Sequence, residues 1–378
     1  MAQPPGQAER VERVSTLELF FDLVFVFTIT QLTAVISDDP SARGLLRVVL
    51  MLGVIWYMYG GYAWLTNAVA ADRAARRLLL LGGMAGFLVL ALAVPSAFSE
   101  GDVAFGVAYL VVVGIHAGLY SRATETSTTR AVIRLAPFNL ASAVLVLAAV
   151  VVEGTAAYAL WAVAFALEWF TPRLAGTGGF RIAPAHFVER HGLVVIVALG
   201  ESIVAIGIGA AGLPVDLALA SVAVLGLLLA ACLWWAYFGG DDIRAERALA
   251  AVPDDRRGWV AIQAFGYWHL LMLLGIITLA AGLKDTIGHA FDPLDLPHAL
   301  LLSGGTALFL VADALFRHTL HLGPTRLRLT AAALVLATVP LGLTTSALTQ
   351  LAALVLVVAG SLLFETKVAS SPGRQPRR

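Results

Sequence analysis

The chain alternates long apolar stretches with short polar ones from residue 17 onward. A helix needs about 20 mostly apolar residues to cross the hydrocarbon core of a bilayer. Windows of that length predict twelve spans, at residues 17–36, 45–64, 78–98, 103–121, 131–151, 155–171, 191–211, 217–238, 258–282, 298–316, 327–345 and 348–364. Because lipid offers backbone N–H groups no partner, each span should be an α-helix. We therefore predict an all-α, polytopic integral membrane bundle of about 12 transmembrane helices.

Composition agrees with a membrane protein and limits its chemistry. Hydrophobic residues make up 59% of the 378 residues and charged residues 13%, whereas about 25% of residues are charged in a typical soluble domain. So few charged side chains cannot cover a water-facing surface. The formal net charge is zero and no dense basic block is present, which argues against nucleic acid as a partner. The single cysteine, Cys232, excludes an intrachain disulfide, and we expect no cofactor and no bound metal.

The polar loops between the spans predict the orientation. Lys and Arg number 25, and all but Arg43, Arg47 and Lys284 fall at the end of the bundle where the chain begins. Basic residues collect on the cytoplasmic side of membrane proteins, so both termini should be cytoplasmic. The chain then divides into a cytoplasmic N-terminal segment, a first six-helix half, a cytoplasmic linker, a second six-helix half and a basic tail, at residues 1–16, 17–171, 172–190, 191–364 and 365–378.

The two halves carry faint signs of an internal repeat. The triplet Val-Glu-Arg at residues 11–13 recurs at 188–190, and His116 of the fourth span falls opposite Asp313 of the tenth. With six spans in each half, two copies would have the same orientation, related by an axis along the membrane normal. Single-residue matches in apolar sequence also arise by chance, so a 6+6 parallel repeat and coincidence both stay open.

Ionisable residues inside the spans are the candidates for function, because a charge at mid-bilayer costs several kcal/mol. They are Glu18 and Asp22 in the first span, His116 in the fourth, Glu168 in the sixth, Glu201 in the seventh, His269 in the ninth and Asp313 in the tenth. Arg190 and Ser202, also near the seventh span, complete the set of substrate- or ion-binding candidates. We predict that carboxylates of the first and seventh spans meet in one polar cavity reached from the cytoplasm. Pairing between helices that only fixes their packing is the alternative.

Two segments resemble signatures of a known family. Residues 18–32 (ELFFDLVFVFTITQL) and 189–207 (ERHGLVVIVALGESIVAIG) are similar to the two signatures of the bacterial low temperature requirement protein A family. Residues 234–238 (WWAYF) and 267–269 (YWH) resemble later family positions. The resemblance covers nearly the whole chain and implies a multi-pass protein of the bacterial inner membrane, named for a cold-growth phenotype. It implies no settled biochemical activity.

Three functions are compatible with these features. The first is a transporter or channel for a cation, a proton or a small solute, in which Glu18, Asp22 and Glu201 form the site. The second is a membrane-embedded enzyme acting on a lipid or isoprenoid diphosphate, with Mg²⁺ held by Asp241, Asp242 and Glu246. The third is a membrane scaffold or lipid sensor that transports nothing. The expected partners are membrane lipids, an unidentified small solute or ion, and a second copy of the chain in a homo-oligomer.

Overall fold

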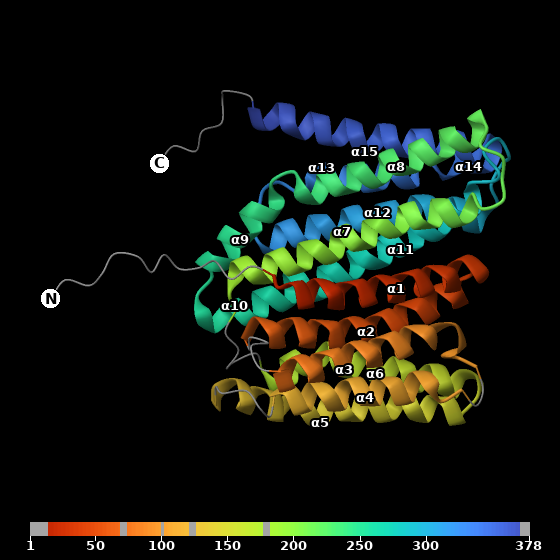
Figure 1. Cartoon of the computed structure of the whole chain (residues 1–378). Helices are drawn as coiled ribbons and strands as arrows, with labels where there is room; N and C mark the ends of the chain where they lie inside the picture. Colours follow the sequence, from red (N-terminus) through yellow and green to blue (C-terminus); the bar gives the residue numbers. More distant parts are fainter. Residues whose placement is uncertain (1–13, 69–73, 100–101, 121–125, 177–181, 371–378) are drawn as a thin grey trace.

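The structure is a computed structural model that describes residues 14–68, 74–99, 102–120, 126–176 and 182–370. Every regular element in these ranges is helical (Figure 1). Ten helices are long and apolar enough to cross a membrane, and Ala104–Leu119 is a shorter apolar helix. With α6, which runs beside them, the described residues form the predicted twelve helical crossings. The all-α polytopic membrane bundle is therefore confirmed.

The first half contains six long helices, which begin and end close to the predicted spans. They are α1 (Thr16–Asp38), α2 (Ala42–Ala68), α3 (Ala74–Leu92) with the 3₁₀ turn η1 (Val94–Ser96), α4 (Ala104–Tyr120), α5 (Thr126–Ala148) with η2 (Ala149–Val151), and α6 (Gly154–Ala175).

The second half has more interrupted helices. They are α7 (Pro184–Gly209), α8 (Leu217–Phe238), the short α9 (Asp241–Ala251), α10 (Asp254–Ala261), the π-helix η3 (Ile262–Trp268), α11 (His269–Thr286), α12 (Leu296–Thr319), α13 (Arg326–Leu336), α14 (Val339–Thr344) and α15 (Ala347–Ser370). The elements α10, η3 and α11 follow one another without a break and form the ninth crossing. Together α13 and α14 form the eleventh.

The same pairs of helices pack together in the two halves. In each half the first crossing contacts the second and third, the third contacts the fourth, the fourth the fifth, and the fifth the sixth, which returns to the second. This order holds for α1–α6 and again for the crossings from α7 to α15. The shared order supports duplication over coincidence.

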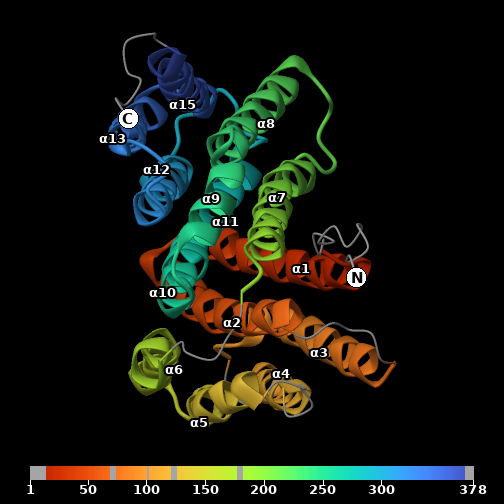
Figure 2. The same ribbon diagram turned by 90° about the vertical axis from the view of Figure 1, so that its left-hand side faces the viewer.

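The halves meet where α1 contacts α7 and α11. Figure 2, which views the bundle along its helices, shows α1 and α2 between the other helices of the first half and α7. Close approach inside the second half depends on small residues. A Cβ added to Gly275 of α11 would lie 2.8 Å from the backbone oxygen of Gly305 in α12, so only glycine allows these two helices to pack this closely.

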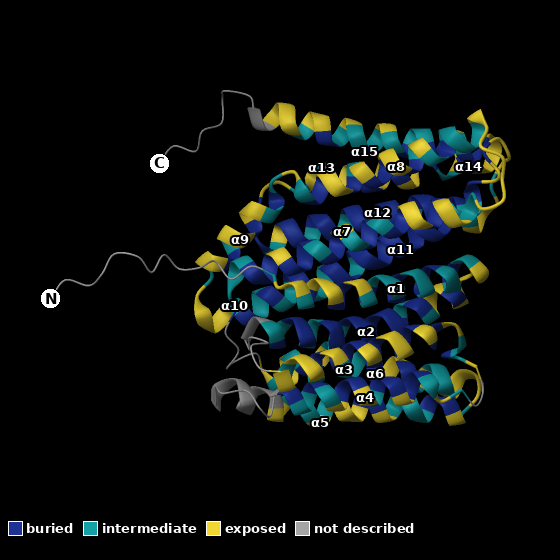
Figure 3. Cartoon of the chain, in the orientation of Figure 1, coloured by how far each residue is buried: buried dark blue, intermediate teal, exposed yellow. Residues whose placement is uncertain are grey.

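Large apolar side chains remain exposed on the outside of the bundle. Examples are Leu78, Leu92, Ile133 and Leu356, which are all more than half exposed, whereas α11 is buried along most of its length (Figure 3). Lipid tails solvate such side chains at no cost, and membrane-embedded helices therefore account for this surface.

Two helices extend past the predicted domain boundaries. Pro184 begins α7, because proline is favoured in the first turn of a helix. The predicted linker 172–190 therefore includes the start of α7, and Arg190 lies within a helix. The predicted tail begins at 365, but α15 continues to Ser370. Residues 1–13 and 371–378 lie outside the described ranges, so the orientation of the termini stays a prediction.

Candidate functional site

The two signature segments lie against each other in the structure. The first forms most of α1 and the second forms most of α7, and these helices pack directly together. Polar side chains at this interface fall into two separate layers. The outer layer lies near the end of the bundle where α1 begins, which we call the amino-terminal end, and the deeper layer lies farther along both helices.

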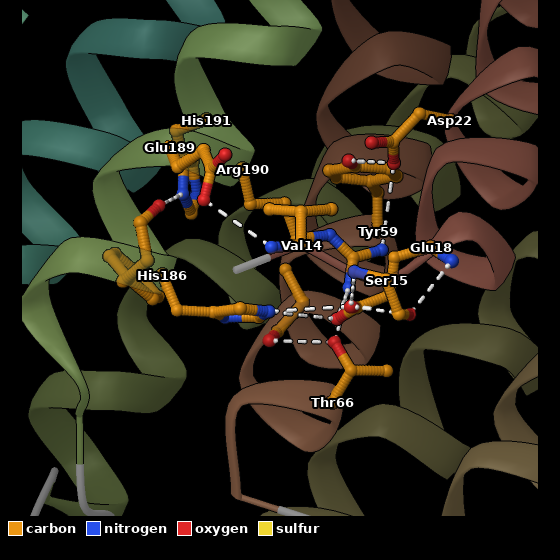
Figure 4. Close-up of polar contacts among 12 residues, drawn as sticks. Val14, Ser15, Glu18, Asp22, Tyr59, Thr66, His186, Glu189, Arg190 and His191 are labelled. Carbon is orange, nitrogen blue, oxygen red and sulfur yellow. Dashed lines mark hydrogen bonds and ion pairs between the residues drawn. The ribbon is translucent and has the colours of Figure 1, made fainter. Parts of the chain in front are cut away.

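Arg190 is the centre of the outer layer (Figure 4). Its Nη1 donates to Glu18 Oε1 at 3.0 Å, and its Nη2 lies 3.5 Å from Asp22 Oδ1. It also donates to the hydroxyl of Thr66 in α2. The hydroxyl of Tyr59, also in α2, donates to Asp22 Oδ1 at 2.5 Å. The predicted proximity of Glu18, Asp22 and Arg190 is therefore present, and α2 contributes two further partners.

Glu18 also fixes the start of α1. Ser15 is the N-cap residue and forms a capping box with Glu18, whose Oε2 accepts from the Ser15 backbone N–H at 2.8 Å. From α7, His186 Nε2 lies 3.2 Å from Glu18 Oε1. One carboxylate thus holds the first turn of α1 and joins it to α7.

The outer layer is almost completely shielded from solvent. Glu18 is 5% exposed, Asp22 2% and Arg190 1%. When both carboxyls are ionised, Glu18, Asp22 and Arg190 together carry one excess negative charge. Asp22 Oδ2 and Arg190 Nε have no hydrogen-bond partner among the described residues. Charges this deeply buried are costly unless they are paired, so each partner of Arg190 matters to the fold.

Glu201 lies in the deeper layer and does not join Glu18 and Asp22. Its Oε2 accepts from the hydroxyl of Thr30 in α1 at 2.6 Å. Eight residues of helix separate Asp22 from Thr30, a rise of about 12 Å. The structure therefore does not contain the predicted pocket shared by Glu18, Asp22 and Glu201. Ser202, next to Glu201, is fully buried, and its hydroxyl has no partner among the described residues.

His269 is held inside the second half. It follows the π-helix, and its Nδ1 lies 2.9 Å from the carbonyl oxygen of Ala264. A carbonyl only accepts, so Nδ1 carries the proton, and Nε2 of the neutral ring accepts from the Tyr237 hydroxyl at 2.9 Å. Both ring nitrogens are engaged, which gives His269 a structural role.

Asp313 belongs to a buried ionic network in the second half, at the amino-terminal end of the bundle. Its Oδ2 lies 3.2 Å from Arg328 Nε, and Arg328 Nη2 lies 3.3 Å from Glu365 Oε2. Arg317 Nη2 lies 2.6 Å from Glu365 Oε1, and its Nη1 lies 3.1 Å from Asp241 Oδ2. Four helices of this half, α9, α12, α13 and α15, are joined by these contacts.

This network changes the interpretation of the acidic residues proposed for Mg²⁺. Asp241 is 2% exposed and is paired with Arg317 and Arg244. Asp242 is partly buried and Glu246 is exposed, so the three residues do not share one surface. Because the Asp241 carboxylate is already neutralised by arginines, the diphosphate-enzyme hypothesis gains no support from the geometry.

A cavity of about 120 Å³ lies between the two halves. Its lining comes from α2, α4, α5 and α6 on one side and from α7 and η3 on the other. His116, one of the predicted candidates, is part of this lining and packs against Gly61, where a Cβ would lie 2.9 Å from its Nε2. None of the carboxylates discussed above is among the described residues that line the cavity.

The cavity touches the outer layer through aromatic contacts. Tyr59, which donates to Asp22, stacks on Trp56 with ring centroids 5.2 Å apart. Trp56 lines the cavity, and its Nε1 donates to the Gly266 carbonyl within the π-helix at 2.8 Å. His191, adjacent to Arg190 on α7, also lines it. These contacts place the outer layer directly behind one wall of the cavity.

Glu168 forms a separate buried cluster in the first half. It is fully buried, and its Oε1 accepts from the hydroxyls of Tyr109 and Ser142. No basic side chain among the described residues forms an ion pair with it, while Oε2 has no hydrogen-bond partner there. Glu168 thus joins α6 to α4 and α5 within the first half.

The two signature segments lie within a region of the chain that matches a known family. The family model described as "Bacterial low temperature requirement A protein (LtrA)" matches residues 13–363. The chain belongs to this family. It is also 30% identical over 316 residues to "Uncharacterized protein RA0937" of Rhizobium meliloti (strain 1021), a match that covers 79% of this chain and 75% of that protein. No solved structure matches the chain.

The LtrA signatures thus supply both sides of the α1–α7 interface in this multi-pass membrane protein of a bacterial family. Sequence reasoning missed the partners of several candidates. The spacing of Arg317, four residues after Asp313, places both on one helix face, but the ion pairs of Arg317 are with Asp241 and Glu365 on other helices. Likewise, no spacing rule connects Tyr59 to Asp22 or Arg328 to Asp313, because these contacts join different helices.

Proposed function

We propose that this LtrA family protein transports a small solute across the bacterial cytoplasmic membrane, along a pathway between its two six-helix halves. The observation that carries the proposal is the cavity lined by residues of both halves, which have the same order of helix contacts. Carriers built from repeated bundles bind their substrate where the repeats meet, beside interrupted helices. The π-helix η3 at the cavity wall is such an interruption.

In this proposal the outer layer closes the amino-terminal end of the pathway. Arg190 of the second half contacts Glu18 and Asp22 of the first, so parting the halves at this end breaks these ion pairs. Glu201 remains the candidate for ion coupling. Its hydrogen bond comes from the neutral hydroxyl of Thr30, which does not neutralise the carboxylate. Both termini are taken to be cytoplasmic, from the distribution of basic residues.

Labelling of a cysteine placed in the cavity tests the proposal without knowledge of the substrate. Gly60 lines the cavity, and a Cβ added there meets nothing within 4 Å. Gly60→Cys is combined with Cys232→Ala, which removes the single native thiol. A membrane-impermeant methanethiosulfonate is applied to right-side-out and to inside-out vesicles; its charged group is joined to the reactive end by a flexible linker, so that only the uncharged reactive end enters the apolar cavity. We expect labelling from both sides, because the pathway opens to each side in turn.

Gly114→Cys in the same background is the matched control. Gly114 is an exposed glycine of α4 with no atom within 4 Å of an added Cβ, and it is not among the residues lining the cavity. Its thiol should face lipid and react slowly from both sides. Labelling of Gly60→Cys from one side alone would contradict transport, and labelling from neither side would favour the scaffold.

A further inference from the structure

The chemistry of the cavity lining indicates what the cavity can bind. None of the described residues in the lining is Asp, Glu, Lys or Arg. An ion placed there would lose its hydration without a counter-charge, which is strongly unfavourable in an apolar site. A neutral guest avoids this cost.

Aromatic side chains make up much of the cavity wall, but several of these rings already stack on another aromatic ring. Tyr267 stacks on Trp169 with ring centroids 4.5 Å apart, and Phe165 stacks on Trp169 at 5.1 Å. Trp56 is stacked on Tyr59. A cation is attracted to the free face of a ring, so these stacks weaken cation–π binding. Ring edges carry positive charge and favour the face of another aromatic ring.

The cavity lining contains a buried hydrogen-bond acceptor that the described residues do not satisfy. Asn139 of α5 is 4% exposed, and its Oδ1 accepts no hydrogen bond from the described residues. A buried acceptor of this kind costs free energy unless a donor satisfies it. A guest that carries an N–H or O–H group would supply that donor.

The size of the cavity limits the guest to about one ring. Its volume is about 120 Å³, and an engineered apolar cavity of about 150 Å³ in another protein binds benzene. On the side of α2, a Cβ added to Gly53 or Gly61 would meet Phe165 or His116, whereas one added to Gly60 meets nothing within 4 Å. A planar ring can pack beside Gly60 and against the aromatic side chains of the lining.

We infer that this cavity binds a neutral, planar, single-ring molecule with an N–H or O–H donor, which donates to Asn139 Oδ1 and packs against the aromatic wall. This inference deepens the proposed transport function, because it names the substrate class of the same cavity. Phenol is the simplest probe with these properties. Toluene has a similar size without the donor, benzoate adds a negative charge, and tetramethylammonium is a cation.

Binding is measured on the full chain in nanodiscs by quenching of tryptophan fluorescence, with a titration of each probe. We expect phenol to bind about tenfold more tightly than toluene, which corresponds to one additional hydrogen bond. Benzoate and tetramethylammonium should not compete with phenol. Asn139→Leu should remove the preference for phenol over toluene.

Two glycine variants separate binding in the cavity from partition into the lipid. Gly60→Leu places a side chain in the cavity and should abolish saturable binding of both rings, whereas Gly114→Leu should leave it unchanged. Because Gly60→Leu does not alter a polar group, its result stands even if Asn139→Leu fails to fold. Equal binding of phenol by the two glycine variants would overturn the inference, and so would preferential binding of tetramethylammonium.

The binding result and the labelling result are independent. Saturable phenol binding with labelling of Gly60→Cys from one side alone would support the ligand class and contradict transport. Labelling from both sides without saturable binding of phenol would support the pathway and overturn the ligand class.

Discussion

Replacing Arg190 is the perturbation for which the structure makes the strongest prediction. The guanidinium is 1% exposed and contacts Glu18 Oε1 at 3.0 Å and Asp22 Oδ1 at 3.5 Å. Arg190→Met keeps a long apolar stem and removes the charge, so two buried carboxyls lose their shared partner. Removing one member of a buried ion pair typically costs about 3–5 kcal/mol. We expect Arg190→Met to lower the free energy of unfolding by about that amount.

Neutralising Glu18, Asp22 and Arg190 together tests whether uncompensated buried charge causes this loss of stability. In Glu18→Gln/Asp22→Asn/Arg190→Met no buried charge is left uncompensated, and the amides can still hydrogen-bond to Ser15 and Tyr59. Replacing a whole buried ionic group by neutral side chains is often close to neutral for stability. We therefore expect the triple variant to recover more than half of the free energy lost in Arg190→Met.

Reversible unfolding in mixed micelles, followed by circular dichroism as the fraction of denaturing detergent rises, measures both differences. Arg244→Met is the matched control, since the Arg244 side chain is 48% exposed and its partner Asp241 keeps a second arginine. It should cost about 1 kcal/mol or less, as exposed pairs do. A loss below about 1 kcal/mol in Arg190→Met, or a triple variant no more stable than the single one, would refute this reasoning.

Three further predictions concern the other clusters. Glu168→Gln should preserve most of the stability because an amide oxygen can still accept from Tyr109 and Ser142, whereas Glu168→Leu leaves two buried hydroxyls unpaired and should cost about 1–3 kcal/mol in the same unfolding assay. Asp241→Ala should cost about 1.5–3 kcal/mol because buried Arg317 loses one of its two carboxylate partners and keeps Glu365, while Glu246→Ala, at an exposed position, should change stability by less than about 0.5 kcal/mol. Asp295→Ala should cost about 1 kcal/mol at pH 7, since Asp295 is the N-cap of α12. Burial raises the pKa of the Asp295 carboxyl, but hydrogen bonds from His298 outweigh this and hold that pKa below its usual range. The contribution of this carboxylate is therefore full above the ordinary aspartate pKa of about 3.9 and is lost as the pH falls through the lower folded-state value. A stability difference between wild type and Asp295→Ala that does not shrink on acidification to that range would contradict this assignment.

The membrane crossings could be predicted from the sequence because lipid imposes one rule on every span. A run of about 20 apolar residues must become a helix, whatever its neighbours are. The errors occur where polar residues enter a helix. The hydropathy pattern places Arg190 in the linker because its charge lowers the hydropathy of the second turn of α7, although Pro184 marks the start of the helix. The π-helix η3 leaves no clear signal in the apolar pattern, since it changes the hydrogen bonding and not the composition.

The candidate site was predicted in part. Glu18, Asp22 and Arg190 are neighbours, and the sequence indicates all three as candidates because they are ionisable residues in or beside apolar spans. Glu201 was assigned to the same group because it also is a buried carboxylate, but its depth along α7 places it beside Thr30. The aromatic cavity was not predicted at all. Its lining comes from six elements across both halves, and no local pattern in a sequence of Trp, Tyr, Phe and Gly residues indicates which of them face a common space.

The rate at which Gly60→Cys reacts from each side of the membrane tests most directly the claim that the two halves enclose a transport pathway. The account predicts that both rates exceed those of Gly114→Cys, and that Arg190→Met raises the rate from the amino-terminal side, because the outer layer no longer holds the halves together there. A Gly60→Cys thiol that reacts from one side alone, at a rate that Arg190→Met does not change, would contradict it.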